Sequence, residues 1–308
     1  MNLEKMIILQ QGELEMVGQL NYFNSNSPCH IYFVCKRPRI TVDINSFSAT
    51  DEELNFRFKI QRQDKADNLK VTFKNDIGTK EITLHSNYPY NSFELRDKAN
   101  EKIMFAKVPV LLQDALGYLE NSDFLDLEVL YIGQSYGVDG ARTAPDRLKN
   151  HSTLQGIYSE AIANNPDCEI WLALASFEQI NLMMFDGTSK FTKDERQIDK
   201  DRFQSVYTRL NFEGINEQQR INFTEAALIK YFQPPYNKIY KDSFPNPAHS
   251  TYSECYELDI NSVCIELQTS ELINCQFYSK TIKRAPWHMK DFLLKSPNDR
   301  KSMFEFEL

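Results

Sequence analysis

Leu127-Glu128-Val129-Leu130-Tyr131-Ile132-Gly133-Gln134-Ser135 is the stretch that decides the fold. Its apolar run predicts a buried strand, and the glycine with the polar residues after it predicts that the strand ends in a turn. A turn at this place exposes polar side chains at the edge of a sheet, where a ligand can reach them. The string alone is weak evidence of a site, so the residues around it must be examined.

Two helices and a further strand are predicted after this stretch. Residues from about 145 to 163 are predicted to be helical, with Pro145 in the first turn, where its missing N–H costs nothing. Glu169-Ile170-Trp171-Leu172-Ala173-Leu174 is predicted to be a buried strand. A second helix is predicted from about Glu217 to Phe232, because apolar residues recur at helical spacing and Pro234-Pro235 follows.

These elements predict an α+β domain over residues 99–245. Residues 1–98, before it, alternate apolar and polar side chains at period two in several short segments. An antiparallel, β-sandwich-like domain for recognition or docking is therefore predicted there. Its strand segments are 40–44, 56–60, 69–73 and 81–84.

The tail, residues 246–308, is predicted to be a C-terminal extension built on a β-hairpin. Its strands are expected at Cys255–Ile260 and Val263–Leu267, with Asn261-Ser262 as the turn. A further strand is predicted between Phe277 and Ile282.

Composition and charge exclude several classes of protein. The 308 residues carry a net charge of −8, which weighs against a protein that coats nucleic acid by bulk attraction. A phosphate-binding surface must then be a small basic patch, for which Lys36-Arg37-Pro38-Arg39 is one candidate; a solvated turn is its other interpretation. No apolar run is long enough to span a membrane, and the first residues do not resemble a secretory leader, so a cytoplasmic protein is expected.

A second candidate patch follows the central strand. Arg147 and His151 are four residues apart, so on a helix they share one face. A guanidinium there can grip a phosphate oxygen while the imidazole beside it exchanges a proton. The alternative is an ordinary solvated helix face.

Glu225 is the most informative single residue. It lies within the apolar stripe of the second predicted helix, where an unpaired carboxylate is costly. It is interpreted either as a metal ligand or as a member of a capping box with Asn222, three residues earlier. Asn237, in the turn after the helix, is either a turn residue or part of the site.

The order and spacing of these residues resemble the GIY-YIG nuclease superfamily. The resemblance rests on Tyr131-Ile132-Gly133, Arg147 with His151, the strand at 169–177, Glu225, and Pro235 with Asn237. It covers about residues 100–240 and leaves both flanking segments unassigned. The ordered set is much more specific than any of its parts.

The resemblance implies a small antiparallel sheet with helices packed on it, and an endonuclease that hydrolyses phosphodiester bonds in one metal-dependent step. In its terms Glu225 binds Mg²⁺ or Mn²⁺, and Arg147 offsets charge on the phosphoryl oxygens. Tyr131 or His151 orients or deprotonates the attacking water, and Asn237 fixes the phosphate or neighbouring side chains. DNA is favoured over RNA, and a role in restriction or anti-phage defence follows by analogy alone. A homodimer and a protein partner of the N-terminal domain are left open.

One departure from the family's pattern matters for activity. The family opens with a Gly-Ile-Tyr strand paired to the Tyr-Ile-Gly strand, and no Gly-Ile-Tyr precedes Tyr131. Gly156-Ile157-Tyr158 spells the motif inside the first predicted helix and is interpreted as a coincidence. The substitute strand is expected at Met104–Val108, which offers Lys107, or around Gly117-Tyr118. The alternative function is a non-catalytic module that keeps the fold to bind nucleic acid or a protein.

Overall fold

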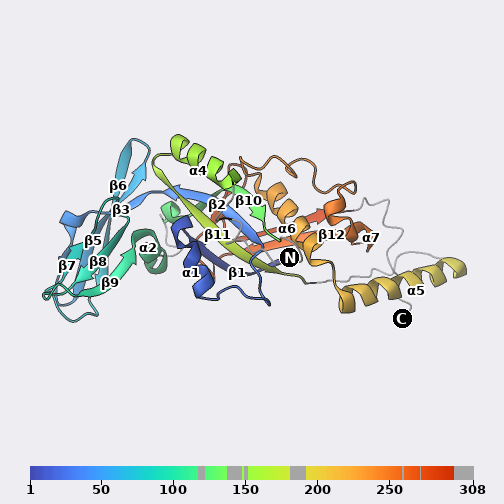
Figure 1. The fold of residues 1–308 in the computed structure, drawn as a ribbon, viewed down its shortest axis with the longest axis horizontal. Helices are drawn as coiled ribbons and strands as arrows, with labels where there is room; N and C mark the ends of the chain where they lie inside the picture. The colour runs from blue at the N-terminus through green and yellow to red at the C-terminus, as the bar shows by residue number, and fades with distance from the viewer. Residues whose placement is uncertain are drawn as a thin grey trace.

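The computed structural model describes residues 1–116, 122–136, 148, 152–180, 192–258, 260–270 and 272–294. Within them the chain is a mixed α and β protein, with one large curled sheet and two smaller sheets (Figure 1). The small sheets gather at one end of the molecule, beyond α2 (Val108–Leu116), and α5 (Lys193–Thr208) extends from the opposite end. None of the described helices is long and apolar enough to cross a membrane.

The large sheet is formed by strands from distant parts of the chain. They are β1 (Asn2–Leu9), β2 (Ile31–Pro38), β10 (Leu127–Gln134), β11 (Cys168–Glu178), β12 (Ser262–Gln268), β13 (Phe277–Tyr278) and β14 (Trp287–Leu293). Their order across the sheet is β13-β10-β2-β11-β1-β12-β14. β2 runs antiparallel to both of its neighbours, β10 and β11.

This strand order corrects the expected division of the chain. The sheet takes strands from all three of the expected segments, 1–98, 99–245 and 246–308. β1 and β2 therefore belong with β10 and β11, and the boundary at residue 98 does not separate two independent units.

Helices cover both faces of the large sheet. On one face α6 (Glu217–Phe232) shares a core with Phe33 and Trp171. On the other face α1 (Leu14–Gln19) and α4 (Ser152–Asn164) share a core with Tyr32. Because neighbouring side chains of a strand point to opposite faces, Tyr32 and Phe33 belong to different cores. The remaining helices are α7 (Glu254–Glu257), a π-helical turn at Arg209–Glu213, and 3-10 turns at Gln11–Glu13, Ile44–Ser46, Asp123–Leu125 and Ser250–Tyr252.

The second predicted helix is confirmed as α6, Glu217–Phe232. It begins at the N-cap residue Asn216, whose side-chain oxygen accepts hydrogen bonds from the backbone N–H groups of Gln218 (3.0 Å) and Gln219 (3.4 Å). It ends at Gln233, which takes the left-handed conformation. The cap and the stop signal therefore fix both ends of this helix.

The first predicted helix overlaps α4, which holds Gly156-Ile157-Tyr158 as expected. The first turns of this predicted helix include residues 145–147 and 149–151, which lie outside the described residues.

A small β unit is inserted between β2 and β10. One sheet contains β3 (Ile40–Val42), β4 (Ser48–Ala49), β5 (Glu53–Arg62) and β6 (Lys65–Lys74), and the other contains β7 (Thr83–His85), β8 (Ser92–Arg96) and β9 (Lys102–Lys107). Both sheets and α2 bury side chains in one core, which includes Phe58 and Phe93. The four period-two segments overlap β3, β5, β6 and β7, so the antiparallel strands themselves were predicted correctly.

The expected C-terminal hairpin is wrong in one of its strands. Val263–Leu267 lies in β12, but its antiparallel partner is β14. The described residues of Cys255–Ile260 do not form a strand, because Glu254–Glu257 forms α7. The Glu254 carboxylate accepts a hydrogen bond from Arg209 Nη2 (2.6 Å) and another from the N–H of Asn216 (2.8 Å), which fixes this segment against the start of α6. Of the strand expected from Phe277, the two residues of β13 are formed.

Candidate functional site

Two tyrosines meet where β2 and β10 pair. The register places Tyr32 of β2 opposite Gly133 of β10, and Val34 opposite Tyr131. The rings of Tyr32 and Tyr131 lie with their centroids 6.2 Å apart. A tyrosine from the N-terminal segment therefore stands beside the Tyr-Ile-Gly string.

The strand expected at Met104–Val108 is not the partner of β10. β9, which holds Met104, pairs with β8 in a separate three-stranded sheet, and Lys107 binds Glu13 at 2.8 Å. Tyr118 lies outside the described residues. The strand that pairs with this part of β10 is β2, which begins at Ile31 and is preceded by His30.

Gly133 is required by the close approach of the two tyrosine rings. A β-carbon on this residue would lie 2.5 Å from the ring carbon that bears the Tyr32 hydroxyl and 2.8 Å from the Tyr131 ring. Tyr32 is fully buried, whereas Tyr131 is half-buried. Any side chain at position 133 would therefore push the pair apart.

Asn237 holds the outer edge of β10. Its Oδ1 accepts a hydrogen bond from the Ile132 N–H at 2.9 Å, and its Nδ2 donates to the Ile132 carbonyl at 2.7 Å. The neighbouring N–H of Tyr236 donates to the Leu130 carbonyl at 3.1 Å. The Asn237 side chain, 7% exposed, thus takes the place of a neighbouring strand and fixes the residue between Tyr131 and Gly133.

α6 contacts the same end of β10 from the other face of the sheet, because its apolar side chains share a core with Ile132, whereas Tyr131 packs against the opposite core. The Asn222 side-chain oxygen accepts a hydrogen bond from Gln134 Nε2 at 3.2 Å, and its amide donates to the Thr251 carbonyl at 2.8 Å. Glu225 is three residues further along α6, so it lies one turn away on the same side of the helix.

Glu225 is an interior residue of α6, half-buried between the buried side chains of Thr224 and Ala226. The capping-box interpretation with Asn222 is wrong, because the helix begins at Asn216. The described residues contain no group of three or more His, Cys, Asp or Glu side chains that could hold a metal ion. A single carboxylate still suits Mg²⁺, which keeps several waters and takes further ligands from a substrate phosphate.

Arg147 and His151 lie outside the described residues, as do Arg142 and Lys149. Leu148 is described and is buried in the core that contains Tyr32. The chain therefore passes over the tyrosine face of the sheet at Leu148.

The basic string at the end of β2 is neither a phosphate grip nor a solvated turn. Arg37 is fully buried, its guanidinium stacks on the Trp171 ring at 3.7 Å, and its Nη1 donates to Gln113 of α2 at 3.1 Å. Burial lowers the pKa of Arg37 to about 10, so the group stays charged at neutral pH. Lys36 binds Asn165 at 2.6 Å and Glu128 at 3.3 Å. Arg37 thus joins α2 of the inserted unit to the large sheet, whereas Lys36 binds residues of the large sheet and of the end of α4.

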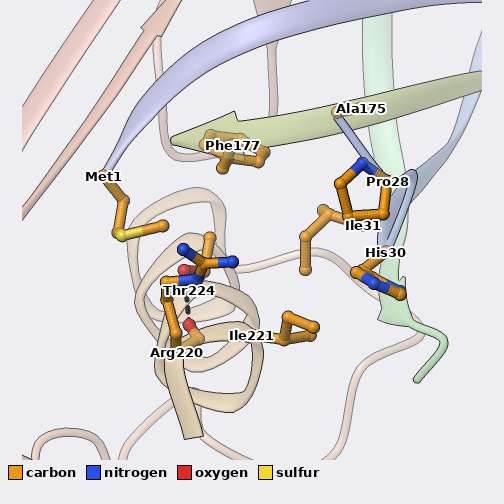
Figure 2. A pocket seen from close by; sticks show the side chains of 9 residues that line it. All are labelled: Met1, Pro28, His30, Ile31, Ala175, Phe177, Arg220, Ile221 and Thr224. Atoms are coloured by element: carbon orange, nitrogen blue, oxygen red, sulfur yellow. Dashed lines mark hydrogen bonds between the residues drawn. The ribbon is translucent and has the colours of Figure 1, made fainter. Parts of the chain in front are cut away.

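A small pocket opens on the α6 face at the start of β2, with His30 and Arg220 on opposite sides (Figure 2). His30 Nδ1 lies 2.5 Å from the Ser135 carbonyl and therefore carries the ring proton, while Nε2 is 3.8 Å from Glu217 Oε1. Burial lowers the pKa of His30, so the ring is neutral at pH 7. His30 thus joins the ends of β2 and β10. The pocket is lined by Met1, Pro28, His30, Ile31, Ala175, Phe177, Arg220, Ile221 and Thr224, and Tyr32 is not among them.

No family model, curated protein or solved structure matches this chain. The geometry of β2, β10 and α6 is therefore the basis on which a function can be proposed.

Proposed function

We propose that the chain is a metal-dependent endonuclease of the GIY-YIG type, which hydrolyses phosphodiester bonds in nucleic acid, with DNA as the favoured substrate. The observation that carries the proposal is the pair of tyrosines on neighbouring antiparallel strands, Tyr32 and Tyr131, packed around Gly133. In this proposal β2 takes the place of the missing first motif strand. The sheet itself is larger than the one the resemblance implies and is mixed, with parallel pairs at β1–β12 and β10–β13.

Each site residue has a role in this proposal. Glu225 would hold Mg²⁺ or Mn²⁺, which supplies positive charge beside the phosphate when bound. The half-buried Tyr131 orients the attacking water through its hydroxyl, and Tyr32 fixes the Tyr131 ring by packing beside it. Arg147 offsets charge on the phosphoryl oxygens and His151 exchanges a proton.

Of the two roles expected of Asn237, this proposal gives it the second, the fixing of neighbouring residues. Both polar ends of its amide are bonded to the backbone of Ile132, so Asn237 positions Tyr131 and Gly133 rather than binding phosphate.

One observation favours a second candidate, a non-catalytic module that binds nucleic acid or a protein. Tyr32 is fully buried, so a phosphate does not reach its hydroxyl group in this conformation. In that case the tyrosine pair only packs the two strands together.

A cleavage assay separates the two candidates. Supercoiled plasmid, single-stranded DNA and RNA are each incubated with the purified protein in Mg²⁺, Mn²⁺ or EDTA. The nuclease requires the metal, and Glu225→Gln should lower its rate by about 100-fold or more. Glu217→Gln is the matched control, because it removes a carboxylate from the first turn of the same helix, beside His30. Absence of cleavage by the wild-type protein, or cleavage that survives both EDTA and Glu225→Gln, would refute the nuclease.

A further inference from the structure

The β5–β6 hairpin carries a basic surface that the proposed site does not use. The two strands pair in continuous register over their whole length, and alternate side chains point away from the core. The outward residues at the middle of the hairpin are referred to below as the basic sheet face. They are Asn55, Arg57 and Lys59 of β5, and Asn68, Lys70 and Thr72 of β6.

Like charges lie directly opposite each other at the centre of this face. The register pairs Arg57 with Lys70, an arrangement that destabilises a sheet. Asp43 lies 3.7 Å from Arg57 and 3.4 Å from Lys59, while Lys70 has no acidic partner among the described residues. The face thus carries three cations against one carboxylate, in a chain with a net charge of −8.

The charge imbalance is confined to the middle of the hairpin. The next outward pair, Glu53 and Lys74, is of opposite sign, and Lys74 also binds Asp76 at 2.6 Å. Arg57 and Lys59 remain accessible, with 44% and 48% of their side chains exposed.

The chemistry of this face suits phosphate oxygens. Its side chains are guanidinium, ammonium, amide and hydroxyl groups, and the Thr72 hydroxyl donates to Asn55 Oδ1 at 2.7 Å. A protein interface needs aromatic or large apolar side chains at its centre, and single-stranded nucleic acid stacks on aromatic rings. The six residues of the face include neither. A duplex backbone, which is read by cations and polar donors, is therefore the best match.

We propose that the basic sheet face binds the phosphate backbone of a nucleic acid duplex, as a second contact remote from the proposed nuclease site. The proposal rests on the proposed function in taking nucleic acid as the ligand. Tyr32 lies near the start of β2, and the inserted unit begins after Pro38 at its end. The strand spans roughly 26 Å, which is comparable to one turn of duplex, about 34 Å. A duplex of several turns is therefore longer than the strand that connects the tyrosine pair to the inserted unit.

The test is the salt dependence of duplex binding by the full chain in EDTA. The probe is a fluorescent DNA duplex about three helical turns long. One variant combines Arg57→Gln, Lys59→Gln and Lys70→Gln. The control combines Lys80→Gln, Lys98→Gln and Lys102→Gln, which removes the same charge from ion-paired lysines of the same inserted unit.

The first variant should lower the slope of log affinity against log salt by about 2 to 3, because each phosphate contact contributes about 0.9. The control should leave the slope unchanged. Equal slopes for the first variant and the wild type, or no duplex binding by the wild type, overturn the proposal. Unchanged duplex binding together with weaker binding to poly-L-glutamate assigns the face to an acidic protein and also overturns it.

The two proposals fail in different ways. Metal-dependent cleavage with equal slopes refutes the basic sheet face and leaves the nuclease. A slope difference without any cleavage refutes the nuclease and leaves the basic sheet face.

Discussion

The two ends of β2 differ in what their side chains contact. At the start, Tyr32 packs beside Tyr131 over Gly133, and at the end Arg37 stacks on Trp171 and binds α2. From the sequence, the basic end is a candidate phosphate-binding patch, and nothing is assigned to the tyrosine end. The structure assigns the basic end to the interior. Burial, rather than residue type, decides whether a charged string can contact a ligand.

The largest effect is expected at the tyrosine end. Tyr131→Phe keeps the ring packing and removes the hydroxyl that orients the water, so the cleavage rate should fall by about 100-fold or more with the melting temperature unchanged. Tyr32→Phe is the matched control and should cost much less, because Tyr32 acts through its ring. Both are measured on plasmid in Mg²⁺. An equal loss in the two variants would show that the Tyr32 hydroxyl itself takes part in the reaction.

At the basic end, substitution is expected to lower the stability of the protein. Arg37→Ala opens a cavity beside Trp171 and leaves Glu169, opposite Arg37 in the sheet, without its cation. The free energy of unfolding should fall by about 3 kcal/mol, as measured by urea denaturation. Arg37→Met, which keeps most of the side-chain volume, should cost less. If Arg37→Ala instead lowered the slope of log duplex affinity against log salt and left stability unchanged, this prediction would be wrong. Arg37 would then be a ligand-binding residue.

Local signals predicted α6 well and β2 poorly. α6 has its N-cap residue, its helical periodicity and its stop signal within one short segment, so nothing distant is needed to define it. The strand that pairs with Tyr131 could not be found in the same way. Residues 39–126 separate β2 from β10, and the described residues among them bury apolar side chains in a core of their own. A motif that requires two strands adjacent in sequence therefore cannot identify β2 as the partner of β10.

The site was predictable only where side chains act locally. Glu225 was located on its helix, but the bonds from Asn237 to Ile132 join parts of the chain that the sequence keeps far apart. Tyr32 was not singled out from the sequence because histidine, not glycine, precedes Ile31, so no Gly-Ile-Tyr string marks it. The signal present was an Ile-Tyr pair that opens an apolar run, and this is common in ordinary strands.

Asp126, beside the start of β10, is expected to make the free energy of unfolding depend on pH. Its carboxyl accepts a hydrogen bond from the Gln276 N–H at 3.0 Å and lies 3.4 Å from Arg284 Nε, yet burial raises its pKa to about 6. In the unfolded chain an Asp ionises near pH 4, so between about pH 4 and 6 the folded state holds the extra proton. The free energy of unfolding should therefore fall as the pH rises through this range, by about 1 to 3 kcal/mol in total.

Asp126→Asn should remove this part of the pH dependence, as followed by the melting temperature from pH 4 to 7. Asp123→Asn, at an exposed position nearby, is the control. An unchanged pH profile in the Asp126 variant would assign the dependence to other groups.

The smallest effect is expected on the basic sheet face, and it separates that face most clearly from Arg37. Lys70→Glu gives Arg57 an opposite charge directly across the strand pair, so the free energy of unfolding should rise by about 0.2 to 1 kcal/mol. The gain should shrink at high salt, because exposed pairs are screened.

The same substitution should weaken duplex binding, since a cation is replaced by an anion beside the phosphates. Lys290→Glu, the same change at an exposed position of β14, should do neither. If Lys70→Glu raised stability but left duplex binding unchanged, Lys70 would not be a contact for the duplex. Arg37 is the reverse case, a cation whose loss costs stability and leaves duplex binding as it was.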